Sequence, residues 1–270
     1  MRFIISIISS FVILSLSGCS TVHNMNKDTR GSSLDLDGKG MLLMSVEFNN
    51  EIRPNKKAGI DQKIVFLLIE TKDKETGHIT THNFRPDESS VFVNDGYAKY
   101  AFRMLLPEGD YRLRLASVEG EYGLGYGLMF LPQPTKAAGL LSLILDTTVK
   151  SGQVNYIGNI SAIIKERTND DELRVSMLSF LKPPYPPQPV DIAAGFQTGT
   201  FKVQVIDKYD SEVSWYKDKY QVLRSYDIGK AILPQYNYDD ARKWANSSGG
   251  FVTHSSYAKP LSDSNKTDTD

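Results

Sequence analysis

The stretch Leu106–Ala116 reads Leu-Pro-Glu-Gly-Asp-Tyr-Arg-Leu-Arg-Leu-Ala and carries the clearest local pattern of the chain. Its Pro-Glu-Gly triplet is typical of a turn, because proline fixes φ and glycine tolerates positive φ. After the turn, Tyr111 and the leucines alternate with Arg112 and Arg114. A period of two is typical of a strand that buries one face. We therefore predict a strand with one buried face and one hydrated face that carries the arginines.

Similar segments lie on both sides of this strand. Apolar or alternating runs, rich in β-branched and aromatic residues, are separated by turn residues. They predict strands over 41–48, 63–71, 80–84, 90–93, 97–104, 140–145, 154–163, 173–180 and 201–206. The pair Asp95-Gly96 favours a tight hairpin between two of them. Many strands joined by short turns predict a mainly β protein, built as an antiparallel β-sandwich.

Helical spacing appears only towards the C-terminal end. From Asp210 onward, the large side chains at 213, 216, 220 and 223 recur on one helix face, and a second short helix is expected over 239–245. Residues 247–270 lack apolar spacing, so we expect disorder. The proline-rich run 182–189 predicts a stiff loop, with a ligand for a partner's aromatic groove as the alternative.

Cys19 is the only cysteine of the chain, and it ends the run Leu-Ser-Gly-Cys over residues 16–19. A basic start and an apolar stretch precede this run, as in a secretory signal. The stretch is short for a bilayer crossing, which takes about 20 residues. An ordinary cleaved signal peptide with a chance cysteine, or a signal anchor, is one interpretation of this segment.

The run 16–19 resembles a bacterial lipobox. The resemblance implies removal of residues 1–18, a diacylglyceryl group on the Cys19 thiol, and a further acyl chain such as palmitate on its amine. Ser20 follows where aspartate would mark inner-membrane retention, so the resemblance implies the outer membrane, facing the periplasm. Residues 20–39 are polar and rich in Ser, Asn, Asp and Gly, which predicts a flexible tether between lipid and domain.

Composition narrows the class of protein. The 270 residues include 31 Lys and Arg against 32 Asp and Glu, a net charge of -1. Removing the signal takes away one positive charge, that of Arg2, and leaves -2. A nearly balanced chain without a concentrated basic face is unlike nucleic-acid binders. With Cys19 acylated the fold has no disulfide, so a hydrophobic core must supply its stability.

Motifs for catalysis or metal binding are weak. The chain lacks a Gly-x-Ser-x-Gly motif. His78 and His82 lie four residues apart and would share one strand face, as two ligands of a metal site could. However, no third potential ligand lies at a spacing typical of a metal site, and histidine is common at the edge of a hairpin. His23 and His254 lie in segments expected to be flexible. The acidic residues near 119–121 and 170–172 are interpreted as solvated, with a glycosidase pair as the alternative. We expect no metal, no cofactor and no enzyme activity.

The run Gly120–Gly127 alternates glycine with Glu, Tyr and Leu. A phosphate-binding loop would follow a strand and open a helix, and this run does not. We interpret it as a mobile loop on a rigid scaffold, where aromatic side chains make a binding edge. The candidate binding loop consists of Tyr122, Tyr126, Met129 and Phe130.

Three motifs in order resemble a known family. Leu106–Leu113 is similar to an L-P-x-G-x-Y-x-L element, Ser151–Gly158 to an x-G-K-x-Y-Y-I/L-G strand, and Phe201–Asp207 with Asp210 and Tyr220 to a closing strand and helix. These motifs resemble those of uncharacterised bacterial lipoproteins with a transthyretin- or immunoglobulin-like sandwich. Gln153 departs from the usual lysine, and the proline-rich insertion is long. The resemblance implies the fold and carries no catalytic residue.

The sequence therefore predicts four parts: a signal peptide over 1–18, an acylated Cys19 with a tether over 19–39, a β-sandwich over 40–233 with an insertion near 182–199, and a helix and tail over 234–270. We expect a lipid-anchored module that binds or scaffolds another envelope protein. The alternatives are a glycan-binding module or an envelope enzyme, and display on the cell surface.

Overall fold

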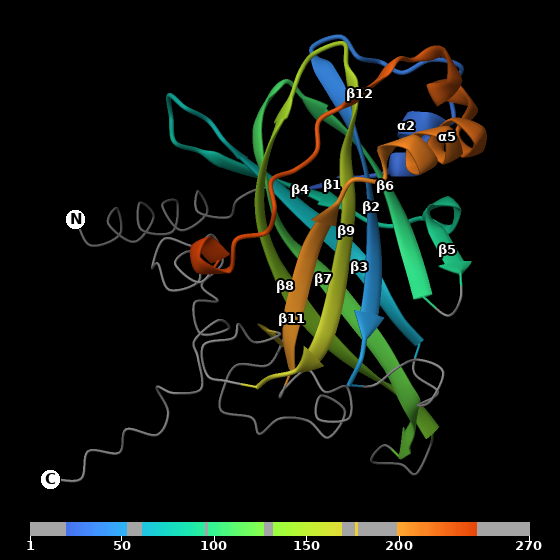
Figure 1. Ribbon diagram of the computed structural model, residues 1–270, viewed down its shortest axis with the longest axis vertical. Coiled ribbons are helices and arrows are strands. Elements are labelled where there is room, and N and C mark those ends of the chain that lie inside the picture. Colours follow the sequence, from blue (N-terminus) through green and yellow to red (C-terminus); the bar gives the residue numbers. More distant parts are fainter. Residues whose placement is uncertain are drawn as a thin grey trace, which may run out of the picture.

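The computed structural model describes residues 20–52, 61–94, 97–126, 132–168, 176–177 and 199–241. Within these ranges the protein is mainly β, as the strand pattern predicts (Figure 1). Two sheets of six strands face each other, and helices cover one of them. No helix of the described ranges is both long and apolar enough to cross a membrane.

The first sheet has the strand order β1-β4-β3-β7-β8-β10. Its strands are β1 (Ser20–His23), β4 (Ile79–Phe84), β3 (Asp61–Lys72), β7 (Gly109–Tyr126), β8 (Pro132–Val149) and β10 (Ser176–Met177). All its neighbours pair antiparallel except β1 and β4, which run parallel. Of the strand predicted over 173–180, only β10 falls within the described residues.

The second sheet has the order β11-β9-β2-β6-β5, and β12 pairs with β9 outside this path. Its strands are β11 (Gly199–Ile206), β9 (Val154–Glu166), β2 (Lys39–Asn50), β6 (Tyr97–Pro107), β5 (Val91–Asn94) and β12 (Ile228–Lys230). Strand β9 runs parallel to both β2 and β12. The expectation of a purely antiparallel fold is therefore wrong, because strands that meet from distant parts of the chain are not held antiparallel by a hairpin.

The main core fills the space between the two sheets. It takes every second residue of a strand, for example Leu42 and Met44 of β2 and Leu143 and Leu145 of β8. Burying each such side chain contributes about 1.5–3 kcal/mol. The intervening Met41 and Leu43 are also fully buried, but on the opposite face of the sheet. Strand β2 is therefore apolar without alternation because both of its faces are covered.

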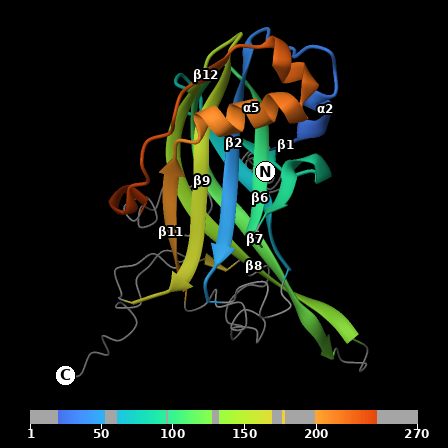
Figure 2. The ribbon, with the colours of Figure 1, turned by 45° about the vertical axis from the view of Figure 1, so that its right-hand side comes forward.

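Helix α5 (Tyr209–Lys219) and the 3-10 turn η2 (Gln221–Ser225) cover the outer face of the second sheet. Figure 2 shows α5 crossing β9, β2 and β6. The helix predicted from residue 210 is confirmed, and the hydroxyl of its buried Tyr216 donates to Met44 O at 2.7 Å. Of the second predicted helix, residues 239–241 lie in a helical segment that begins at 238 and reaches the end of the described residues.

The turn chemistry of the sequence is visible in the structure. Strands β5 and β6 pair from Asn94 opposite Tyr97, the register that a tight hairpin requires. Gly152 joins β8 to β9 with φ +75°, a conformation that favours glycine. Tyr111 and Tyr156 are buried, and their hydroxyls donate to Pro107 O and to the Glu212 carboxylate.

The prediction for Arg114 is wrong, although Tyr111 and Leu113 are buried as expected. Arg114 is 2 % exposed, and its guanidinium donates to Glu70 at 3.1 Å. The register of β7 against β8 shifts between Leu113 and Leu115. An irregularity of this kind breaks the alternation of side chains, so the face of Arg114 does not follow from counting by twos.

The prediction of a flexible tether over 20–39 is also wrong. Strand β1 joins the first sheet, and the short helix α2 (Met25–Thr29) packs next to it. Met25 is 1 % exposed, and Leu34 is buried beneath η2. The segment is polar in composition because most of its side chains face outward, whereas these two apolar residues fix it to the domain.

Several predicted features lie outside the described residues. They are the signal over 1–18, Cys19, Met129 and Phe130 of the candidate loop, the acidic residues 170–172, the proline-rich run 182–189, His254 and the tail over 247–270.

Candidate functional site

The residues that follow Cys19 form a small, well-defined unit. Asn24 is the N-cap of α2, and its side-chain oxygen accepts a hydrogen bond from Lys27 N at 3.1 Å. Asparagine is a favoured N-cap because it satisfies one of the free amide groups at a helix start. Met25 enters the core, and its sulfur accepts from Arg103 N at 3.3 Å. The N-terminal segment is thus attached to the backbone of β6.

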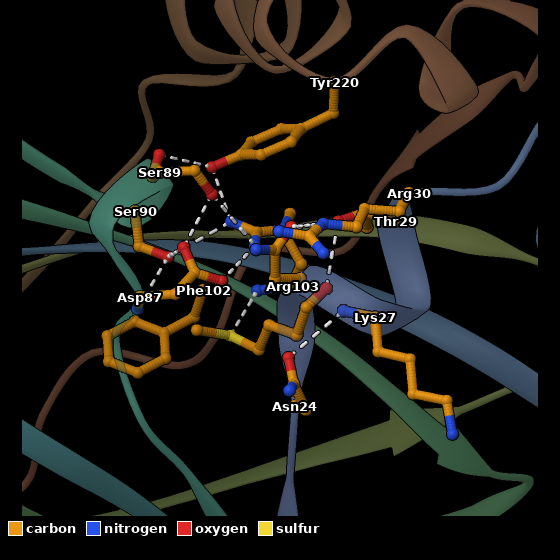
Figure 3. Close-up of polar contacts among 12 residues, drawn as sticks. Asn24, Lys27, Thr29, Arg30, Asp87, Ser89, Ser90, Phe102, Arg103 and Tyr220 are labelled. Atoms are coloured by element: carbon orange, nitrogen blue, oxygen red, sulfur yellow. Dashed lines mark hydrogen bonds and ion pairs between the residues drawn. The ribbon is translucent and has the colours of Figure 1, made fainter.

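Arg103 is the centre of this attachment (Figure 3). Its side chain is fully buried, in the middle of the apolar strand β6. Its N–H groups donate to oxygens of Thr29, Asp87, Ser89, Ser90 and Tyr220. The guanidinium has five N–H donors, so this set uses all of them. We call Arg103 and its five partners the arginine clasp.

The arginine clasp joins four parts of the chain. Thr29 belongs to α2, at 3.2 Å from the Arg103 Nε atom. The serines belong to the turn η1 (Glu88–Ser90) and Asp87 is its N-cap, with Asp87 Oδ2 at 2.7 Å from the guanidinium. Tyr220 stands between α5 and η2, and its ring centroid lies 4.0 Å from the Arg103 Cζ atom. A single buried cation therefore holds the N-terminal segment, η1 and the C-terminal helices together.

The electrostatics of the clasp favour the ion pair. Burial opposes ionisation of Asp87, but hydrogen bonds from Ser89, Ser90 and Arg103 outweigh it and lower the pKa of Asp87. Burial raises the pKa of Tyr220, so its hydroxyl stays protonated. Because every donor of Arg103 already has a partner, the clasp has no free group with which to bind an anion. Its role is to hold these parts of the fold together.

A pair of histidines attaches β1 to the sheet. His23 Nε2 lies 2.9 Å from His82 Nδ1, and the His23 ring stacks on Phe84 with centroids 4.4 Å apart. His82 is 6 % exposed, and burial lowers its pKa to about 4. Burial also lowers the pKa of His23, against the opposing charge of Asp28. Both rings are thus neutral at neutral pH, and His23 is not in a flexible segment as the sequence suggested.

The structure separates the two histidines that the sequence placed together. His78 is exposed in the turn before β4, whereas His82 is buried in that strand. Among the residues that the structure describes, no group of three or more His, Cys, Asp or Glu side chains is placed to hold a metal ion.

A second buried polar cluster lies beneath α5. Ser45 Oγ lies 2.9 and 2.7 Å from the two carboxylate oxygens of Glu212, and Tyr156 donates to the same carboxylate at 3.0 Å. Lys99 forms an ion pair with Glu212. A serine beside a carboxylate and a lysine has the residue types of a nucleophilic site. However, Ser45 is fully buried and Glu212 is 3 % exposed, so no substrate reaches them. The cluster attaches α5 to the sheet.

Two of the four candidate binding residues fall on a strand, and Met129 and Phe130 lie outside the described residues. Tyr122 and Tyr126 belong to β7, paired with Thr135 and Pro132 of β8, so the stretch 120–126 is not the loop that its glycines suggested. Strand β3 pairs with β7 only as far as Glu121. The two strands therefore continue beyond their neighbour as a two-stranded arm, which projects from the body of the protein in Figure 2. Whether this arm binds a partner stays a prediction.

Little in the amino-acid sequence indicates the arginine clasp. A charged residue between Phe102 and Met104, inside an apolar strand, was the available signal, because a buried arginine needs partners. Those partners come from positions far away along the chain, and nothing local identifies them.

Comparisons of this chain with protein-family models, with curated proteins and with solved structures find no match.

Proposed function

We propose that this chain is a lipid-anchored protein of the bacterial cell envelope. Acyl chains on Cys19 hold it in the outer membrane, facing the periplasm, and its sandwich of sheets serves as a non-enzymatic module that binds or scaffolds another envelope component. The observation that carries the proposal is the Leu-Ser-Gly-Cys run over 16–19, which follows an apolar signal stretch and directly precedes β1.

The anchor is physically sufficient without a spanning helix. Each buried methylene contributes about 0.8 kcal/mol, and two or more chains on one residue give a stable attachment. Two facing sheets with a terminal helix also agree with the resemblance to lipoproteins that carry transthyretin- or immunoglobulin-like sandwiches. The two buried polar centres that the structure describes, around Arg103 and Glu212, hold elements of the fold together.

The projecting arm of β7 and β8 is our candidate for partner contact. We would place a photo-crosslinking amino acid at Tyr126 in living cells and identify the captured species by mass spectrometry. A matched probe at Thr76, exposed in the turn between β3 and β4, controls for general surface contact. A parallel experiment with Cys19→Ser separates anchored contacts from unspecific ones.

We expect one discrete envelope protein to be captured from position 126, not from position 76, and to be lost in Cys19→Ser. Capture of glycan would replace the scaffold proposal with a glycan-binding one. Equal capture from both positions, or capture that does not depend on Cys19, would contradict the proposed interface.

A further inference from the structure

We propose that the N-terminal segment β1–α2 is a membrane-contact face, with Val22 against the lipid surface and Lys27 and Arg30 among anionic headgroups. This inference rests on the proposed acylation of Cys19. It extends that proposal by stating how the domain is oriented, and by naming the bilayer as the occupant of this face.

The distance between lipid and domain is short. Cys19 is bonded to Ser20, and Ser20 is the first residue of β1. An extended chain advances about 3.3–3.6 Å per residue, so the backbone of Val22 lies within about 11 Å of the acylated residue. A free segment over 20–39 would instead reach about 70 Å. The folded segment therefore keeps the domain at the membrane surface.

The same segment is held rigidly enough to set an orientation. Strand β1 pairs with β4 from Ser20 to His23, and the histidine pair fixes its last residue. Met25 and Thr29 then attach α2 to Arg103. An anchor that leads directly into two such attachments restricts rotation of the domain, whereas a flexible tether would leave all orientations open.

The exposed side chains of this segment suit a lipid surface. Val22 is 58 % exposed, the most exposed large apolar residue within the described ranges. A lone exposed valine is ordinary in itself. This one, however, lies three residues from the acyl chains. Lys27 and Arg30 are exposed, whereas Met25 is buried. Residues three apart share one side of a helix.

The charge of the segment has the sign that anionic lipid requires. Between residues 21 and 34 the charged side chains are Lys27, Arg30 and Asp28, so two positive charges and one negative give +1 with His23 neutral. Burial raises the pKa of Asp28, against the lowering effect of nearby cations. Basic residues near a membrane surface each contribute about 1 kcal/mol of attraction to anionic lipid.

The test uses the single cysteine of the chain. With Cys19 acylated, a Val22→Cys substitution gives one free thiol for an environment-sensitive fluorophore. The full acylated protein is placed in vesicles of phosphatidylethanolamine and phosphatidylglycerol that contain a lipid-borne quencher. Gln204→Cys, exposed on β11 at an edge of the second sheet, is the matched control. The mass of the N-terminal peptide and flotation with the vesicles verify the anchor independently.

We expect lipid-borne quencher to reduce emission at position 22 and to leave position 204 almost unchanged. The double change Lys27→Glu and Arg30→Glu should weaken the quenching at 22 without releasing the protein. If acylated protein floats but both positions are equally unquenched, the inference is overturned and the anchor stands. Protection of position 22 from both lipid-borne and aqueous quenchers would replace the bilayer by a protein partner. Absence of acylation would overturn both proposals.

Discussion

At the scale of single residues, Arg103 is a buried charge that holds several elements of the fold together. The guanidinium is fully buried, and all of its donors are used, so its desolvation is compensated by an ion pair and hydrogen bonds. Removing it would leave Asp87, two serine hydroxyls and Tyr220 without their common donor. The cost of losing such a partner exceeds the net stabilisation of the pair itself.

We therefore expect Arg103→Leu to lower the free energy of unfolding by about 3–5 kcal/mol. The matched control is Arg112→Leu, because Arg112 binds Asp146 through two bonds of 2.6 and 3.0 Å on an exposed surface. An exposed pair contributes about 1 kcal/mol or less. Chemical denaturation of both variants measures the difference. Equal losses in the two variants would mean that the clasp has no special role.

The histidine pair makes a prediction about pH. His82 has a pKa of about 4 in the folded protein against 6.5 for the free side chain. Between these values the unfolded chain binds more protons, so stability falls as the pH drops from about 6.5 to about 4. His82 faces His23 and the ring of Tyr111. Phe84 stacks on the other ring of the pair, His23, and the charge of Asp28 acts on His23.

We expect His82→Phe to flatten this part of the stability profile. Urea denaturation of both proteins at several pH values between 4 and 7.5 measures the slopes, and the difference between them isolates His82 from the carboxylates, which titrate in both. The part of the loss that His82 causes, taken as the difference between the two proteins, should be on the order of 3 kcal/mol across the interval. Identical slopes for the two proteins would show that His82 is not held neutral by burial.

At the scale of elements, β1 and α2 are the part of the fold that composition misrepresents. A polar segment attached through a few buried side chains has the composition of a linker. Met25 fills a space in the main core, so truncating it leaves a cavity there. Loss of Met25 should loosen the whole segment, because β1 is only four residues long.

We expect Met25→Ala to lower the free energy of unfolding by about 2–5 kcal/mol. Hydrogen exchange should accelerate at the amides of residues 20–30 more than in the two sheets. Met25→Leu, which conserves most of the volume, is the control and should cost less than about 1.5 kcal/mol. Unchanged exchange over 20–30 in Met25→Ala would show that this segment does not depend on its buried methionine.

Elements that depend on contacts between sequence neighbours could be predicted, whereas pairings between distant parts of the chain could not. The strand after Leu106, the hairpin register at Asn94 and the helix after residue 208 depend on neighbours in sequence, and the sequence predicted them. The parallel pairing of β2 with β9 does not, because about a hundred residues separate the two strands. Arg114 is buried through Glu70, on another strand, so local alternation assigned it to water.

Of the candidate site, the sequence carries a local signal only for acylation of Cys19, in the run over 16–19, and this part stays a prediction. The arginine clasp depends on contacts between α2, η1, β6 and Tyr220, which are separated along the chain. Glycine-rich composition suggested a loop over 120–127, but pairing with β8 makes a strand of 120–126.

At the scale of the whole molecule, the proposed anchor leads directly into the fold. Cys19 leads directly into β1, β1 joins the first sheet, and the arginine clasp connects α2 to the second sheet and to the C-terminal helices. The arm of β7 and β8 projects from the body of the protein (Figure 2). If Cys19 is acylated as we propose, this arrangement would keep the domain at a membrane and leave the arm available to a partner.

The most direct test of the anchor is the mass of the N-terminal peptide of the protein extracted from cell envelopes. We expect the peptide to begin at Cys19, with a diacylglyceryl group on sulfur and an acyl chain on nitrogen, and we expect Cys19→Ser to release the protein from the membrane fraction. A peptide that keeps residues 1–18, or that begins at Cys19 with a free thiol, would contradict the anchor and the membrane-contact face derived from it.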